Sequence, residues 1–314
     1  MSFIKVENLS AKYNTSKGSV HALDDVSFFL EGGESVGIAG ESACGKTTLG
    51  LSMIRMIPGG EIVSGNILFE EKSILDLSES EFDKNYRWKK IAMVFQGAMN
   101  SLDPVFTIKE QFIEILRQHH YKDDFDKLIL DAVTSVSLDG SILKKYPHEL
   151  SGGMKQRIVI AMALLLKPKF VIADEPTTAL DVLVQAQIIN LLKKLKKSGM
   201  SIMLISHDLA IISEVAEKIG IMYAGQLVEF GKSSDIFKNP KHPYTQGLLE
   251  SIPTLRENKK PKFIKGVPPN LAEPQSGCRF IERCPLAMEK CKKEPPKFKT
   301  DSGYVMCWLY DDKL

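Results

Sequence analysis

The sequence contains no long hydrophobic run. Its strongest apolar stretch, residues 158–166, is far shorter than the ~18 to 20 residues that a helix needs to cross a bilayer. Residues 1–9 alternate apolar and polar side chains like an edge strand and lack the uninterrupted apolar region of a secretory signal. We therefore expect a cytosolic protein, for which any role at a membrane depends on a partner that crosses it.

Neither sign of charge is in excess. The 41 Lys and Arg residues nearly balance the 39 Asp and Glu residues, which leaves a formal net charge of +2. No overall field therefore favours nucleic acid as a partner. Cysteine is also scarce, since the chain has five, of which four lie after residue 277. A chain of this length and hydrophobic fraction can bury a core, so it should fold without disulfides. The length of 314 residues and the hydrophobic fraction of 44% suit one large domain and a smaller appendage.

The order of the apolar runs predicts an α/β fold. Between residues 3 and 231 predicted strands alternate with helical stretches, as in a parallel or mixed sheet covered by helices. Strands are predicted at Val36–Ala39, Ile91–Phe95, Phe170–Ala173 and Ile202–Ile205. The last three are short apolar runs bounded by polar or turn residues, which is typical of strands buried on both faces.

Two further segments have a different character. Residues 101–146 follow helical spacing and predict an inserted helical subdomain at about 100–165. After residue 231, prolines break any long helix and predict a linker that packs over the main domain. These prolines are Pro240, Pro243, Pro253, Pro261, Pro268, Pro269 and Pro274. We therefore predict a main domain at 1–235 and a C-terminal extension at 236–314.

The most informative segment is glycine-rich. Residues 40–48 read Gly-Glu-Ser-Ala-Cys-Gly-Lys-Thr-Thr and lie between an apolar strand and a helical stretch, the context of a phosphate-binding loop. Its amides and the helix N-terminus would converge on phosphates. Lys46 would reach the β- and γ-phosphates, and the Thr47 hydroxyl would hold Mg²⁺. The predicted nucleotide contacts are Gly40, Glu41, Ser42, Cys44, Gly45, Lys46, Thr47 and Thr48.

Polar residues at the ends of three predicted strands complete a hydrolytic site. Asp174 and Glu175 follow one strand, where the first would bind Mg²⁺ and the second would polarise the attacking water. Alone, such adjacent acids more often form a solvated turn, but a phosphate-binding loop precedes them. Gln96 and His207 end two other strands, at the edge where open α/β sheets bind ligands. We predict catalytic roles for Glu175, His207 and Gln96, with Gln96 also a ligand of Mg²⁺.

A second segment that could bind phosphate follows the helical stretch at 101–146. Leu150–Gln156 places Ser151, Gly152 and Gly153 at the start of a helix, with Ser151 as the N-cap. Because the loop at 40–48 already holds this chain's nucleotide, the second segment best serves to cover ATP that is bound by another subunit. The sequence therefore predicts dimerisation as well as ATP binding.

These motifs resemble the ATP-binding cassette (ABC) family of transport ATPases over the first ~235 positions. The resemblance assigns the family's signature to Leu150–Gln156, its dimer-facing loop to Ala179–Asp181 and its switch histidine to His207. It also implies that Tyr13 stacks on adenine. Ala43 departs from the pattern, since the family usually has glycine there, which reduces backbone freedom in the loop. The predicted fold class is an α/β P-loop NTPase with a helical subdomain and a small metal-binding extension.

Two stretches narrow the resemblance to ATPase subunits of dipeptide and oligopeptide importers: residues 95–104 and 239–249. It implies peptide uptake by two such subunits, the second a paralogue, at the cytoplasmic face of the membrane. Their partners would be two permeases and an extracytoplasmic peptide-binding protein. Residues 96–106 would line the groove for a permease helix. Related subunits also serve nickel or oligosaccharide import, and these substrates stay open.

Other classes of cassette protein fit less well. DNA-repair members carry long coiled coils between the loop and the signature, and no sustained heptads occur here. Members that act on ribosomes carry two cassettes, and this chain has one. A degenerate cassette that binds ATP without hydrolysis would lack the polar residues that this chain retains at 96, 175 and 207.

The extension contains Cys278, Cys284, Cys291 and Cys307. Without an export signal, clustered thiols more often bind metal than form disulfides. Four thiolates suit an iron–sulfur cluster or zinc, with free thiols as the third possibility. The absence of a Cys-x-x-Cys pair weakens zinc, and related importer subunits include members with a [4Fe-4S] cluster in the tail. Such a group would staple a short, proline-rich segment, and a redox role stays open.

Overall fold

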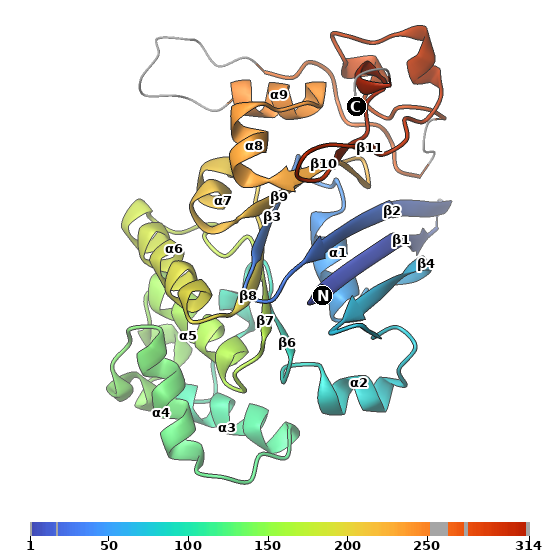
Figure 1. Cartoon of the computed structure of the whole chain (residues 1–314). Coiled ribbons are helices and arrows are strands. Elements are labelled where there is room, and N and C mark those ends of the chain that lie inside the picture. Colours follow the sequence, from blue (N-terminus) through green and yellow to red (C-terminus); the bar gives the residue numbers. More distant parts are fainter. Residues whose placement is uncertain (1, 17, 252–262, 273–275, 312–314) are drawn as a thin grey trace. The chain divides into compact units, whose positions relative to one another are not determined.

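The computed structural model describes residues 2–16, 18–251, 263–272 and 276–311 (Figure 1). The chain divides into two compact units. We call residues 1–75 with 205–314 the terminal unit and residues 76–204 the middle unit. The predicted boundary between 235 and 236 falls inside the terminal unit and stays a prediction, as does the extent of the helical subdomain. Pro253, Pro261 and Pro274 lie outside the described residues.

The terminal unit begins with an antiparallel sheet (Figure 1) of order β2-β1-β4-β5. Its strands are β1 (Ile4–Thr15), β2 (Gly18–Leu30), β4 (Gly60–Phe69) and β5 (Lys72–Ser73). The expectation that the first strand lies at an edge was wrong, because Ile4 pairs with both Leu30 and Phe69. Alternating side chains show that one face is buried. They do not show how many strands pair in the plane of the sheet.

Further strands in the described part of the terminal unit have the order β11-β12-β10-β9-β3. They are β3 (Ser35–Ala39), β9 (Lys218–Tyr223), β10 (Gln226–Lys232), β11 (Phe298–Lys299) and β12 (Tyr304–Val305). β3 runs parallel to β9, whereas β9, β10 and β12 pair antiparallel. The last two strands come from the predicted extension, which therefore continues the sheet of the main domain.

The described part of the terminal unit contains the helices α1 (Lys46–Met53), α7 (Leu209–Val215), α8 (Ser233–Lys238) and α9 (Pro243–Glu250). Helix α7 packs closely on β3, since a Cβ atom at Gly37 would lie 2.1 Å from Cγ2 of Ile212. Pro243 opens α9 instead of breaking a helix, because the first helical position needs no amide hydrogen. Helix α9 lies entirely within the predicted extension.

The middle unit contains the strands β6 (Ile91–Val94), β7 (Phe170–Asp174) and β8 (Ser201–Ile205), whose last residue begins the terminal unit's second segment. β6 and β7 pair parallel, with Ile91 opposite Phe170. Every residue of these strands is buried. The predicted strands, including the one near residue 36, are thus confirmed, because uninterrupted apolar runs of this length fit a sheet covered on both faces.

The helices of the middle unit are α2 (Glu79–Asn85), α3 (Ile108–Gln118), α4 (Phe125–Ser135), α5 (Gly152–Leu164) and α6 (Val182–Lys197). Helix α3 starts with a capping box between Thr107 and Glu110, which satisfies two free backbone amides. It buries Ile108, Phe112 and Leu116, as the helical spacing predicts. Among the described residues, no helix has both the length and the apolarity for a transmembrane span.

The extension is anchored by aromatic rings. Tyr223 lies 4.6 Å from the ring centre of Tyr244 and 5.2 Å from that of Phe280, which lies 5.4 Å from Tyr244. Buried Glu229 on β10 accepts hydrogen bonds from the backbone amides of Lys241 and His242, at 2.8 and 3.0 Å. These contacts fix α9 and the segment around Phe280 on β9 and β10.

Candidate nucleotide-binding site

Two glycines of the loop at 40–48 have backbone conformations that other residues rarely adopt. Gly40 has φ of +152° and Gly45 has φ of +103°. A Cβ atom on Gly40 would lie 2.2 Å from the carbonyl oxygen of Met222, and one on Gly45 would lie 2.3 Å from that of Ala22. Because both neighbours are backbone atoms that cannot rotate away, only glycine allows this tight turn.

Between the glycines, Ala43 has φ of +61°, a left-handed conformation that disfavours a residue with a Cβ atom. The sequence predicted reduced backbone freedom at this position. Two residues later Gly45 caps the N-terminus of α1, and the Leu49 amide donates a helical hydrogen bond to the Gly45 carbonyl at 2.9 Å. The loop therefore leads directly into a helix N-terminus, as a phosphate site requires.

Lys46 is held inside the loop. Its ammonium donates to the carbonyl oxygens of Gly40 and Glu41, each at 2.8 Å, and the residue is only 8% exposed. The Cys44 sulfur lies 3.8 Å away, and burial raises the pKa of this thiol, so it is neutral at physiological pH. This arrangement supports packing as the role of Cys44 and leaves the ammonium as the positive charge of the loop.

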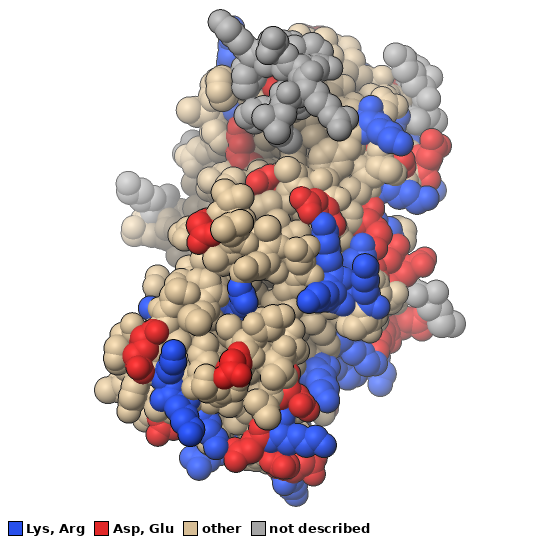
Figure 2. All heavy atoms as spheres, turned by 90° about the vertical axis from the view of Figure 1, so that its left-hand side faces the viewer, with Lys and Arg blue, Asp and Glu red and all other residues tan. Residues whose placement is uncertain are grey.

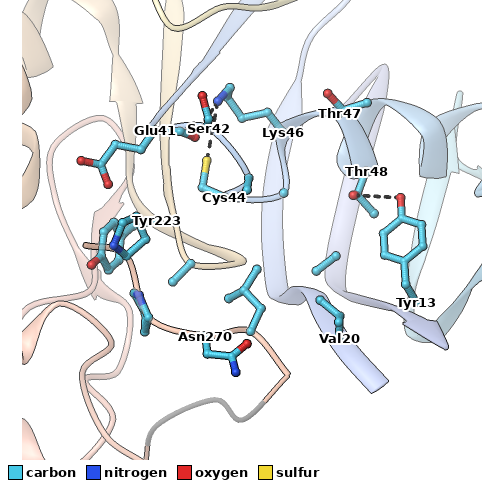
Figure 3. A pocket seen from close by; sticks show the side chains of 17 residues that line it. Tyr13, Val20, Glu41, Ser42, Cys44, Lys46, Thr47, Thr48, Tyr223 and Asn270 are labelled. Atoms are coloured by element: carbon cyan, nitrogen blue, oxygen red, sulfur yellow. Dashed lines mark hydrogen bonds between the residues drawn. The ribbon is translucent and has the colours of Figure 1, made fainter. Parts of the chain in front are cut away.

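The loop forms one wall of a cavity of about 650 Å³, a volume typical of small-molecule sites. Tyr13 from β1 stands at another wall, where its hydroxyl lies 3.1 Å from Oγ1 of Thr48 (Figure 3). The exposed Thr47 is the second residue of α1. The lining residues named by the sequence are Tyr13, Glu41, Ser42, Cys44, Gly45, Lys46, Thr47 and Thr48.

The sequence motifs do not reveal a further wall of this cavity. Residues 268–271 of the extension line it, and Asn270 lies on the side opposite Ser42 and Lys46 (Figure 3). The segment is attached to β2, because the His21 amide donates to the Leu271 carbonyl at 3.0 Å. A contact between segments about 250 residues apart leaves no local sequence pattern from which it could be predicted. The sequence indicated only that Pro268 and Pro269 restrict the backbone here.

The middle unit places its predicted residues at the ends of parallel strands. Asp174 ends β7 and is fully buried, and Glu175 follows with φ of +48°. The Glu175 carboxylate accepts a hydrogen bond from Thr178 Oγ1 at 2.9 Å. Gln96 lies two residues beyond β6, which pairs with β7. The three side chains therefore belong to one edge of this unit's strands.

The glycine pair of the predicted signature has two distinct functions. Ser151 caps α5 and accepts a hydrogen bond from the Met154 amide at 3.3 Å, which confirms the predicted N-cap. A Cβ atom on Gly153 would lie 2.7 Å from Val184 of α6, whereas one on Gly152 would find only ordinary contacts beyond 3.8 Å. Gly153 therefore serves close packing, whereas Gly152 is exposed at the start of α5.

His207 belongs to the terminal unit and is exposed. The amide of the preceding Ser206 donates to the carbonyl of Ile38 at 3.1 Å. This bond places His207 at the end of β3 from which the phosphate-binding loop starts. Asp208 then caps α7 by accepting from the amides of Ala210 and Ile211.

The four cysteines of the extension lie close to one another. The Cys278 amide donates to the Cys291 carbonyl at 2.9 Å. Burial, together with the neighbouring thiols of Cys291, Cys307 and Cys284, raises the pKa of Cys278 to about 11. Burial and two of the same neighbours raise that of Cys307 to about 11. Within the described ranges, however, no set of three His, Cys, Asp or Glu side chains has the arrangement of a metal site.

Two family models match the chain. The ABC transporter model matches residues 23–178, and the model of the oligopeptide/dipeptide transporter C-terminal region matches residues 228–291. The first match includes the loop at 40–48 and the acids that end β7. The second includes most of β10, the whole of α9 and three of the four clustered cysteines.

Relatives and solved structures agree with these matches. The dipeptide transport ATP-binding protein DppD of Bacillus subtilis is 42% identical over 99% of this chain and 95% of its own length. The oligopeptide transport ATP-binding protein OppD of Escherichia coli is 42% identical over 93% of this chain and 88% of its own. A dimeric ATP-binding cassette, solved with ADP and Pi, is 28% identical and has a TM-score of 0.65, covering 73% of this chain and 98% of that one.

The chain therefore belongs to the ABC transporter family, and its fold is that of an α/β P-loop NTPase. Within this family it is an ATP-binding subunit of the dipeptide/oligopeptide transporter branch. Both conclusions confirm what the motifs predicted.

Proposed function

We propose that this chain hydrolyses ATP to power the uptake of dipeptides or oligopeptides at the cytoplasmic face of the membrane. The main support is the loop at 40–48, which forms a wall of a cavity of nucleotide size in a chain whose relatives are named for dipeptide and oligopeptide transport. Import of nickel or oligosaccharides would use the same ATPase chemistry, and we favour peptides because both relatives are named for them.

The terminal unit grips the nucleotide. The buried Lys46 ammonium, already oriented by the Gly40 and Glu41 carbonyls, binds the β- and γ-phosphates. Tyr13 stacks on adenine. The hydroxyl of the exposed Thr47 would supply an oxygen ligand of the kind that Mg²⁺ prefers, and Gln96 and Asp174 would provide further ligands.

Three side chains catalyse hydrolysis. Glu175 polarises the attacking water and accepts its proton, while His207 and Gln96 contact the γ-phosphate. When bound, Mg²⁺ would neutralise charge on the phosphates. Ser151, Gly152 and Gly153 cover the ATP of a second subunit, for which the exposed start of α5 at Gly152 is suited.

The partners that we propose are a second ATPase subunit, a paralogue, together with two permeases and an extracytoplasmic peptide-binding protein. Exposed apolar side chains support such contacts. Val182 and Leu183 are 79% and 77% exposed beside the predicted dimer-facing loop, and Val105 is 75% exposed in the predicted permease groove. On the face in Figure 2, Lys and Arg are interspersed with Asp and Glu, which suits protein partners and not nucleic acid.

We further propose that Cys278, Cys284, Cys291 and Cys307 hold a [4Fe-4S] cluster, with Zn²⁺ as the alternative. The donor set fits, because four thiols lie close together in a segment with only short helices and strands. Among the described residues these thiols are not arranged as a metal site.

The hydrolytic assignment is tested with Glu175→Gln. This variant should bind ATP and accumulate a closed dimer, with the wild-type partner subunit where needed. Hydrolysis should fall by about 10²- to 10⁴-fold, as for loss of a general base. Lys46→Ala is the control and should lose both binding and dimer. Wild-type turnover by Glu175→Gln would remove Glu175 from the mechanism.

The substrate and the cluster need separate experiments. Vesicles with the permeases and both ATPase subunits should take up a labelled dipeptide in an ATP-dependent way, and uptake of nickel or an oligosaccharide instead would replace the peptide assignment. Anaerobically purified protein should be brown and contain iron and sulfide, which Cys291→Ser should lose. Stoichiometric zinc without iron would overturn the cluster.

A further inference from the structure

The C-terminal extension contacts the phosphate-binding loop through one arginine. Arg283 binds the carboxylate of Glu41 with both terminal nitrogens, at 2.7 and 2.8 Å. The Arg283 side chain is only 5% exposed. A two-pronged pair of this kind is stronger and more directional than an ordinary surface ion pair.

The remaining contacts of Arg283 fix its direction. Its Nε donates to the Lys265 carbonyl at 2.9 Å, and one terminal nitrogen donates to the Tyr223 hydroxyl at 3.2 Å. The guanidinium also lies 5.6 and 5.9 Å from the ring centres of Tyr223 and Phe280, within reach of cation–π attraction. Arg283 is thus held independently of Glu41.

Glu41 is also held on the side of its backbone. Its amide donates to the Tyr244 hydroxyl at 2.9 Å, and its carbonyl accepts from the Lys46 ammonium at 2.8 Å. The residue that orients the lysine of the loop is therefore gripped by two residues of the extension, Tyr244 and Arg283. Residues 268–271 line the same cavity.

A carboxylate in a phosphate-binding loop creates an electrostatic problem. Glu41 lines the cavity, and an unpaired negative charge there would repel a nucleotide's phosphates. Arg283 neutralises that charge and pulls the carboxylate toward the extension. No other cation is paired with Glu41 among the described residues.

We propose that Arg283 is a positioning residue of the nucleotide site, which acts through Glu41 to set the charge and shape of the phosphate-binding loop. The extension is then a part of the nucleotide site and not only an attachment to it. This inference rests on the proposed assignment of the loop to ATP, and the experiment separates the two.

The test measures binding of ADP with Mg²⁺ and of adenosine by calorimetry, with the full chain, at two salt concentrations. Arg283→Gln should weaken ADP binding about tenfold, as for loss of a hydrogen-bonded charge partner, and leave adenosine binding within about twofold. Glu41→Gln in the same chain should restore ADP binding to within about threefold of wild type, because the unpaired charge is gone. Higher salt should reduce the defect of Arg283→Gln.

Arg279→Gln is the matched control. Arg279 is another buried arginine of the extension, but it pairs with Asp24 on β2 and not with the loop. It should leave ADP binding within about twofold of wild type. An equal loss in Arg279→Gln, or no rescue by Glu41→Gln, would show a general loosening of the extension and overturn the proposal.

Lys46→Ala separates the assignment of the loop to nucleotide from the role of Arg283. If it binds ADP like wild type, the assignment of the loop to nucleotide is wrong, and the role of Arg283 is wrong with it. If Lys46→Ala loses binding while Arg283→Gln binds normally, only the role of Arg283 is wrong.

Discussion

The His242 side chain accepts a hydrogen bond from the Tyr244 amide, at 3.0 Å to Nδ1, at the start of α9. His242 is buried, and burial lowers its pKa from 6.5 to about 3. The ring is therefore neutral in the folded protein at physiological pH. Protonation would remove the acceptor and leave a buried charge.

This relationship predicts acid sensitivity. Below pH 6.5 the unfolded chain takes up a proton at His242 that the folded chain resists, so the stability present above that pH is lost toward pH 3. The slope should approach ~1.4 kcal/mol per pH unit for one proton. Buried Glu229, whose pKa is raised by burial, acts oppositely, because its stabilising effect is greatest at acid pH and is lost as pH rises.

Urea unfolding between pH 6.5 and 5 avoids most carboxylates, which titrate mainly below this range. Because burial also lowers the pKa of His119, the share of His242 is measured as the difference between wild type and a variant. His242→Asn keeps an acceptor at the helix start and should have a clearly smaller slope than wild type. Equal slopes in the two proteins would show that another group causes the acid sensitivity.

Gly153→Ala should destabilise the protein by about 1 to 3 kcal/mol, the usual cost of an overpacked contact. The added methyl group would lie 2.7 Å from Cγ1 of Val184. Gly152→Ala is the matched control and should have little effect on thermal unfolding. Val184→Ala, combined with Gly153→Ala, should recover much of the loss, and a failure to recover it would mean that the helices do not meet as described.

Tyr13 offers a test of base stacking. Tyr13→Phe removes the hydroxyl contact with Thr48 but keeps the ring, so ATP affinity should stay within about threefold, whereas Tyr13→Ala should lose ~1 to 3 kcal/mol of binding. Competition with a fluorescent nucleotide measures both variants. If Tyr13→Phe is as weak as Tyr13→Ala, the hydroxyl and not the ring matters.

The clustered thiols should react slowly when metal-free. Because the pKa of Cys278 and that of Cys307 are raised to about 11, little thiolate exists at neutral pH, and alkylation should accelerate nearly tenfold per pH unit between 8 and 10. Mass spectrometry of iodoacetamide adducts follows each site, with glutathione as the reference thiol. Rapid labelling of both cysteines at pH 7.5 would contradict a buried thiol group.

The sequence predicted those parts of the protein that depend on neighbours along the chain. The strand from Phe170, the helix spacing at Ile108 and the Ser151 cap each follow from a few adjacent residues. The loop at 40–48 was likewise visible because a strand, a glycine-rich turn and a helix follow one another directly.

What could not be predicted depends on residues far apart in the chain. The interior place of β1 required pairing with residues 60–69. The ion pair of Glu41 with Arg283 joins positions 242 residues apart, and neither residue type indicates its partner. The different roles of Gly152 and Gly153 also become visible only in the fold, where Val184 of α6 lies beside Gly153 of α5.

The two short strands after residue 297 have a practical consequence for engineering. Tyr304 and Val305 pair with Phe230 and Glu229, so a truncated protein that ends near residue 235 would expose the hydrogen-bonding edge of β10, a known route to aggregation. A chimera that takes its C-terminal extension from a relative should therefore also take β10 from that relative. The strand pair β10–β12 then comes from one protein.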